Sequence, residues 1–249
     1  MMEKLIESFK DTFYNRYELK PYLLPKKTKF ALILPGGGYS FVCGAYEGYP
    51  VAKELNRLGY SAFVLRYRTK KKGRFPAPQD DVARALKFIL SNADVFNVEK
   101  ENFSIWGGSA GGHLAASFGT DNMGYKNYNL PKPALLVLMY PVITMGKYTH
   151  EGSFQNLFGN EKYRAFGSIE KQVTPDYPAT YVWCCEGDDV VPQQNTEFMI
   201  EALKKNGVPY IGKIIPGVKK GHGIAIGKGT NAEGWAEEAI AFWEKQSIK

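Results

Sequence analysis

The chain has 249 residues, of which 44% are hydrophobic and 14% aromatic, so it has enough apolar side chains for one large folded domain. Its formal net charge is +7, but the basic residues are scattered, and the one tight lysine cluster, residues 70–72, falls in a polar stretch. Without a zinc-finger or RNA-binding signature beside it, that cluster indicates an exposed loop and argues against a nucleic-acid partner.

Apolar runs alternate with helical stripes along the chain. The runs at residues 30–34, 60–67, 102–106, 134–140, 179–186 and 210–215 are typical of buried strands. Apolar residues with helical spacing follow at 51–58, 82–90, 110–118, 198–203 and 235–243. Gly59 and Gly207 are placed to end two of these helices. Strands that are apolar on both faces and alternate with helices predict an α/β fold with a mostly parallel sheet covered on each side.

The segment 142–174 lacks a regular period and carries glycine, serine and aromatic residues, with room for one or two short helices. We expect residues 1–249 to form a single domain in which this segment shapes the substrate site. No stretch is long enough for a large cap domain.

The three cysteines, Cys43, Cys184 and Cys185, are odd in number, and two are adjacent in an apolar run, which argues against a disulfide framework. Neighbours on a strand point to opposite faces, so Cys184 and Cys185 are expected to be buried. The first 20 residues lack the apolar core of a signal peptide, and the longest apolar run is too short to span a bilayer. These features predict a cytoplasmic protein without a membrane partner.

Residues 107–111 read Gly-Gly-Ser-Ala-Gly and fit the nucleophile-elbow pattern G-x-S-x-G. In such an elbow, a serine stands on a strained turn between a strand and a helix, with its hydroxyl exposed in a cleft. Ser109 would lie at a helix N-terminus, which favours negative charge. The pattern also arises in plain turns, so its interpretation depends on the rest of the chain.

A serine hydroxyl needs a base to remove its proton, usually a histidine, and the chain has three. His113 lies in the helix after Ser109, where a structural role is favoured. His150 lies in the irregular segment, where it either lines the cleft or faces solvent. His222 lies between two glycines after the last predicted strand, in a loop where its ring has room to reach a partner, so it is the predicted base.

The base in turn needs a carboxylate that orients it. Two aspartates, Asp188 and Asp189, follow the predicted strand 179–186. We assign Asp188 as the acid and Asp189 as a capping or solvent-exposed residue, with the reverse assignment left open. The order Ser109, Asp188, His222 is the order of α/β-hydrolases.

An acyl-transfer site also requires N–H donors for the oxyanion. The backbone N–H of Ala110 is one donor, and the glycines that follow the predicted strand 30–34 offer Gly37 and Gly38. The dinucleotide spacing G-x-G-x-x-G would need a glycine where Phe41 stands, and the Walker pattern is absent, so nucleotide binding is disfavoured. The elbow, the glycines, the acid and the base all follow predicted strand ends, where ligands bind in such sheets.

Several blocks, taken together and in order, resemble the α/β-hydrolase esterases of the acetylesterase and acetyl-xylan-esterase type, which are also described as feruloyl-esterase-like or lipase/esterase. They are Pro-Gly-Gly-Gly-Tyr-Ser-Phe at 35–41, Glu-Gly-Tyr-Pro-Val-Ala at 47–52, Phe-Val-Leu-Arg-Tyr-Arg at 63–68, Pro-Ala-Pro-Gln-Asp at 76–80, Gly-Ser-Ala-Gly-Gly-His-Leu-Ala at 108–115, His-Glu-Gly-Ser at 150–153, Asp-Asp-Val-Val-Pro at 188–192 and Gly-His-Gly at 221–223.

The resemblance implies that Ser109 is the nucleophile, Asp188 the acid and His222 the base. It implies an oxyanion hole formed by Gly37, Gly38 and Ala110. Tyr39 and His150 are candidate substrate-binding residues. Lipases of the His-Gly-Gly-Gly type carry histidine where this chain has Pro35, which argues against a long-chain lipase.

The expected function is that of a serine carboxylic ester hydrolase acting on short acyl esters, with acetylated sugars or xylo-oligosaccharides as the substrates that the resemblance implies. No ligand cluster indicates a metal or cofactor, so none is expected. A kynurenine-formamidase-type amidase on the same fold, or an inactive hydrolase fold that binds a ligand, is the alternative. The oligomeric state, monomer or homo-oligomer, is left open.

Overall fold

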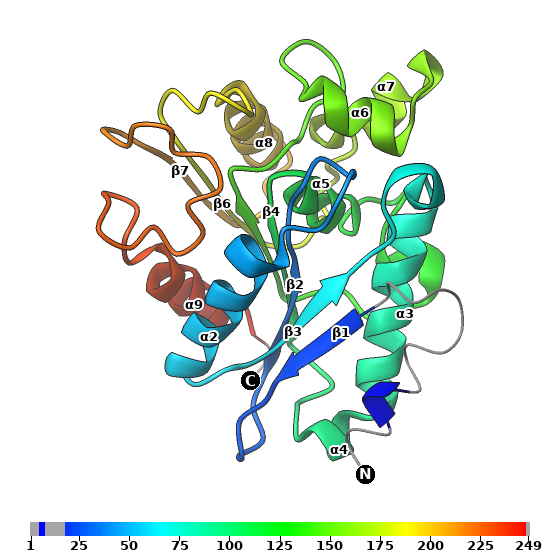
Figure 1. Cartoon of the computed structure of the whole chain (residues 1–249), viewed down its shortest axis with the longest axis vertical. Helices are drawn as coiled ribbons and strands as arrows, with labels where there is room; N and C mark the ends of the chain where they lie inside the picture. Colours follow the sequence, from blue (N-terminus) through cyan, green and yellow to red (C-terminus); the bar gives the residue numbers. More distant parts are fainter. Residues whose placement is uncertain (1–4, 8–17, 248–249) are drawn as a thin grey trace.

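The computed structural model describes residues 5–7 and 18–247, in which a seven-stranded sheet runs through the centre (Figure 1). The strand order is β1-β3-β2-β4-β5-β6-β7, with β1 antiparallel and the other neighbours parallel. The strands are β1 (Glu18–Tyr22), β2 (Phe30–Leu34), β3 (Ser61–Arg66), β4 (Ser104–Gly108), β5 (Leu135–Met139), β6 (Thr180–Cys185) and β7 (Tyr210–Ile215).

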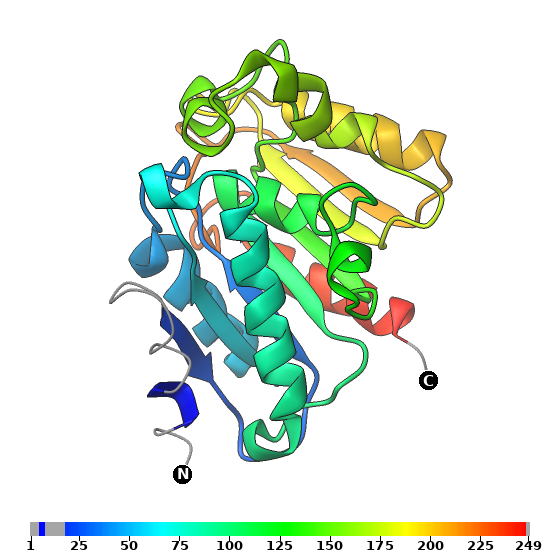
Figure 2. The ribbon, with the colours of Figure 1, turned by 90° about the vertical axis from the view of Figure 1, so that its right-hand side faces the viewer.

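Helices cover both faces of this sheet. The longer ones are α2 (Tyr49–Arg57), α3 (Ala77–Ser91), α5 (Ser109–Ser117), α8 (Gln194–Lys205) and α9 (Trp235–Gln246). Apolar residues of α3, α5 and α8 pack with alternate side chains of the sheet in one core. Those of α2 and α9 pack with the remaining side chains in a second core, and Figure 2 shows the helices of the two faces on opposite sides of the strands.

The alternation predicted from the sequence is confirmed for all six apolar runs. Strand β4 begins two residues later than its predicted start, because Asn102 adopts a left-handed conformation with φ 57°. The edge strand β1 is absent from the prediction. Its residues include Glu18, Lys20 and Pro21, which suit an exposed edge and hide the apolar signal of a strand.

The loops and short helices beyond the carboxyl ends of the parallel strands gather at one edge, at the top of Figure 1. The segment 142–174 lies there and contains four short helical pieces: α6 (Glu151–Leu157), η4 (Glu161–Tyr163), α7 (Arg164–Gly167) and η5 (Ile169–Lys171). The irregular character of this segment is therefore confirmed, with more helical turns than predicted. The assignment of residues 1–249 to one domain remains our proposal.

The predictions for the two adjacent cysteines and for the lysine cluster are confirmed. The cysteines Cys184 and Cys185 are free and buried, on neighbouring positions of β6. Lysines 70–72 lie in the exposed turn η2 (Lys70–Gly73), as the polar stretch predicts. Within residues 5–7 and 18–247, every helix is too short or too polar to traverse a bilayer.

Candidate functional site

Ser109 stands at the junction between β4 and α5, with a left-handed backbone (φ 53°) that is unfavourable for a residue with a side chain. The turn is tight because Gly111 allows α5 to approach β2: a Cβ atom at Gly111 would lie 1.9 Å from the carbonyl oxygen of Leu34. Ser109 retains only 6% of its accessible surface. The predicted elbow geometry is therefore present.

The side chains of Ser109, His222 and Asp188 form one chain of hydrogen bonds. His222 Nε2 lies 2.9 Å from Ser109 Oγ, and His222 Nδ1 lies 2.8 Å from Asp188 Oδ2. Because a carboxylate only accepts, Nδ1 carries the proton that is donated to Asp188, and Nε2 accepts from the serine hydroxyl. In the order 109, 188, 222 the three residues are 79 and 34 positions apart, yet they meet where β4, β6 and β7 end.

Asp188 is held by its own loop as well as by His222. Its second oxygen, Oδ1, accepts hydrogen bonds from the backbone N–H groups of Val190 and Val191, both at 2.9 Å. The side chain is fully buried, whereas Asp189 is exposed. The alternative role of Asp189 as a cap of α8 is wrong, since the N-cap of that helix is Gln193 and has no side-chain capping bond.

The glycine loop that follows β2 reverses direction next to the elbow. Gly37 and Gly38 have φ values of 124° and 61°, and the carbonyl of Gly38 accepts a hydrogen bond from Asn156 of α6 at 2.9 Å. Among the described residues, no protein acceptor pairs with the backbone N–H of Gly37 or Gly38. The N–H of Ala110 lies in the first turn of α5, where a helix leaves its N–H groups unpaired.

Tyr39, which we expected to bind substrate, does not face the site. The side chain is fully buried, and its hydroxyl lies 2.9 Å from Nδ1 of His113. A left-handed backbone at Tyr39 (φ 57°) turns the ring beneath the glycine loop and away from solvent. We correct the prediction: Tyr39 supports the loop from below.

His113 confirms the structural role that was favoured for it. The ring is fully buried, and its Nε2 lies 2.9 Å from the carbonyl oxygen of Gly167 in α7. Since a carbonyl only accepts, Nε2–H donates to it and Nδ1 accepts from the hydroxyl of Tyr39. Burial lowers the pKa of His113 to about 4, so the ring is neutral at pH 7.

His150 is half-buried at the start of α6, where Ser153 N–H donates to its Nδ1 at 3.2 Å. A Cβ atom at Gly38 would lie 3.5 Å from its Cε1 atom, so His150 borders the glycine loop. Burial and the positive charge that His222 can carry lower the pKa of His150, while Asp188 acts in the opposite direction. His150 thus faces the same site as His222.

Two residues beside the site were not among the site residues predicted from the sequence. Tyr140, which follows β5, packs edge-on against the His222 ring with centroids 4.9 Å apart, and its hydroxyl accepts from the N–H of Ala225. Glu47, in the short π-helix η1 (Gly44–Gly48), is a buried carboxylate whose Oε2 accepts from the N–H of Gly36. Glu47 stands in one of the family-like blocks, which is the one signal that singles it out. In the described ranges, 5–7 and 18–247, no three His, Cys, Asp or Glu side chains are grouped as metal ligands would be.

Residues 22–203 match the BD-FAE family. The chain belongs to this family. It is 33% identical over 217 residues to endo-1,4-beta-xylanase B of Butyrivibrio fibrisolvens, which covers 82% of the chain and 34% of the xylanase. It is 35% identical over 132 residues to an acetylxylan esterase of Xylanibacter ruminicola, which covers 53% of the chain and 26% of the esterase. The chain thus spans about a third or less of the length of these two relatives.

Among solved structures, the acetyl ester-xyloside bifunctional hydrolase from Caldicellulosiruptor lactoaceticus is similar over almost the whole chain. The TM-score is 0.81 at 32% identity, over 92% of this chain and 88% of that one. The fold is that of the α/β-hydrolases, as the sequence predicts.

Proposed function

We propose that this BD-FAE family member is a serine carboxylic ester hydrolase that removes short acyl groups, above all acetyl, from sugars or xylo-oligosaccharides. The observation that carries the proposal is the hydrogen-bonded chain from Ser109 through His222 to Asp188. The substrate class rests on the names of the relatives, an acetylxylan esterase and an acetyl ester-xyloside hydrolase.

In the proposed reaction, His222 Nε2 accepts the hydroxyl proton as Ser109 Oγ attacks the ester carbonyl. The distance of 2.9 Å between these atoms allows direct transfer. Asp188, held by His222 and by two backbone N–H groups, fixes the tautomer and stabilises the imidazolium that forms. His222 then protonates the leaving alcohol, and a water activated by the same ring releases the acyl group from Ser109.

The tetrahedral intermediate carries a negative oxygen, which needs N–H donors in a site shielded from water. We assign this role to the N–H groups of Gly37, Gly38 and Ala110. The first two have no protein acceptor among the described residues, and the third opens a helix whose dipole favours an anion. His150, which borders Gly38, is proposed to line the acyl or alcohol side of the substrate.

The test combines labelling with substrate selectivity. A fluorophosphonate is expected to add once to the wild-type protein, as measured by intact mass, and not to the Ser109→Ala variant. Nitrophenyl esters of increasing chain length should give the highest kcat/KM for acetate, and acetylated xylo-oligosaccharides should release acetate. An adduct that persists in Ser109→Ala would refute the nucleophile, and a maximum at long chains would refute the acyl preference.

A further inference from the structure

We propose that Glu47 is a positioning residue of this site: it holds the Gly36 end of the glycine loop and places a second carboxylate beside His222. The inference rests on the proposed function, because both actions matter for a reaction in which Ser109 attacks and His222 carries a proton.

The carboxyl group of Glu47 lies between the elbow and the glycine loop. Its Oε2 accepts a hydrogen bond from the N–H of Gly36 at 2.5 Å. A Cβ atom would lie only 2.5 Å from this oxygen at Gly36 and 3.0 Å from it at Gly108. Gly108 precedes the elbow serine, and Gly36 precedes the proposed oxyanion donors Gly37 and Gly38. Both glycines leave space for the carboxylate of Glu47.

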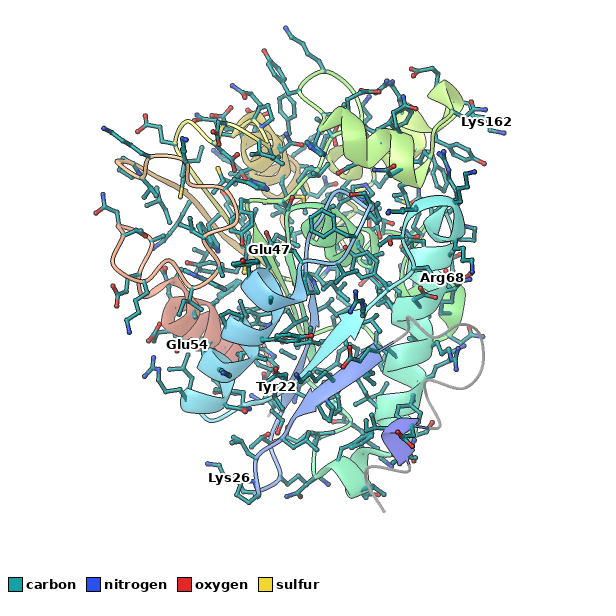
Figure 3. All side chains as sticks on the ribbon, viewed as in Figure 1. Tyr22, Lys26, Glu47, Glu54, Arg68 and Lys162 are labelled. Atoms are coloured by element: carbon teal, nitrogen blue, oxygen red, sulfur yellow. The ribbon has the colours of Figure 1, made fainter. Side chains whose placement is uncertain are left out.

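The other oxygen of Glu47 faces the loop that carries the histidine. A Cβ atom at Gly223, the residue after His222, would lie 3.5 Å from Oε1. Only 5% of the surface of Glu47 is accessible, so little water separates its charge from the site. Figure 3 shows Glu47 just ahead of α2, near the centre of the view, whereas Glu54 lies within α2 at its outer side.

The electrostatic setting of Glu47 is consistent with this placement. Burial raises the pKa of its carboxyl, while the Gly36 N–H and the charge of a protonated His222 favour the ionised form. Glu47 and His222 are also faced by groups from the neighbouring elements. These groups are Cys43, Tyr67, Tyr140, His150 and Asp188. Of these, Asp188 is the other carboxylate, and it contacts the opposite ring nitrogen from the one that meets Ser109.

Two variants of Glu47 separate its role as a hydrogen-bond acceptor from its role as a charged group. Glu47→Gln keeps an oxygen that accepts from Gly36 N–H but removes the charge, and Glu47→Ala removes both. The matched control is Glu54→Gln, the same substitution on a carboxylate of α2 that pairs with the exposed Arg57.

In Glu47→Gln, the acid limb of the kcat/KM–pH profile should move to lower pH by about one unit, because loss of a nearby negative charge disfavours the imidazolium. Its kcat at the plateau should stay close to wild type. In Glu47→Ala, kcat should also fall by about 10²-fold, because the proposed oxyanion donors lose their anchor. Glu54→Gln should match the wild type in both respects.

The second readout needs no substrate. In NMR titrations of the histidine Cε1–H signals, the His222 ring should take up its proton at lower pH in Glu47→Gln than in the wild type, while His113 serves as an internal reference. An unchanged His222 titration in Glu47→Gln, or equal kcat in Glu47→Ala and the wild type, would overturn the inference. A wild-type protein that hydrolyses no ester would refute the proposed function, and the NMR result would still decide the placement of charge at Glu47.

Discussion

Helix α5 and the loop after β7 each contribute a histidine to the neighbourhood of Ser109, and the two rings differ in the charge of their partners. His113 is fully buried between the hydroxyl of Tyr39 and the carbonyl of Gly167, both uncharged. The side chain of His222 is 12% exposed and meets the carboxylate of Asp188 at one nitrogen. In His113 and in His222, each ring nitrogen has a hydrogen-bond partner, so the number of hydrogen bonds does not distinguish the structural histidine from the proposed base. The carboxylate partner of His222 distinguishes them.

This contrast predicts the largest effect for His222. In His222→Ala, kcat/KM for a short ester should fall by about 10⁴–10⁶-fold, because no other base in the described part of the chain contacts Ser109 Oγ. Steady-state kinetics with nitrophenyl acetate measures the loss. The unfolding free energy in urea should change by about 1 kcal/mol, as expected for a part-exposed loop residue. If His222→Ala lost activity because the protein unfolded, the result would not support a role of His222 as the base.

The two neighbouring aspartates, Asp188 and Asp189, differ in burial, so their substitutions should have different effects. Asp188→Asn should lower kcat by about 10⁴-fold, since an amide no longer fixes the tautomer of His222. Asp189→Asn, on the exposed neighbour, should stay within about twofold of wild type. The ratio of the two kcat values is the measurement, and equal losses would contradict the assignment of Asp188.

His113 should show its effect in stability. In His113→Asn, the unfolding free energy should fall by about 2–4 kcal/mol, because a buried network loses its partners and a void forms. Activity of the folded fraction should remain within about tenfold of wild type. Urea denaturation followed by kinetics on the same preparation checks both, and a selective loss of kcat without destabilisation would show that the ring takes part in catalysis.

The same ring predicts a pH dependence whose sign follows from its pKa. The value is about 4 in the folded chain, against 6.5 ordinarily, so the unfolded chain binds the proton first as the pH falls. The contribution of the neutral His113 ring to the unfolding free energy is fully present above about pH 6.5. As the pH falls from there to about 4, the unfolding free energy decreases by about 3 kcal/mol. Urea denaturation of the wild type and of His113→Asn across this range measures it, and parallel slopes would contradict it.

The smallest effect is expected for Tyr39. Tyr39→Phe keeps the buried ring and removes the hydroxyl that donates to His113 Nδ1, so stability should fall by about 1 kcal/mol. KM for acetate esters should not change, because the ring has no exposed surface to offer a substrate. A KM several times higher, with stability unaltered, would restore the substrate-binding role.

The sequence predicts most of the sheet because buried parallel strands are uninterrupted apolar runs, as at β2 and β5. It fails at β1, whose polar edge residues resemble a loop, and at the four short helical pieces of 142–174, which are too brief to show a period. The positions of Ser109, Asp188 and His222 follow from motif and order. The direction of the Tyr39 side chain depends on one left-handed backbone angle, which the sequence does not predict. The block at 47–52 includes Glu47, but no pattern in it indicates that this glutamate is buried beside the site.

The distance in sequence between Ser109 and His222 has a consequence for synthesis. While the ribosome is still extending the chain through α8, β4 and the elbow are complete, but neither β7 nor the loop with His222 exists. Parallel strands pair only after their long connections close, so the last partner of Ser109 joins late. Under the proposed mechanism, Ser109 of a nascent chain therefore lacks its base until β7 and the loop with His222 are in place, and the onset of reactivity toward a fluorophosphonate would mark that moment.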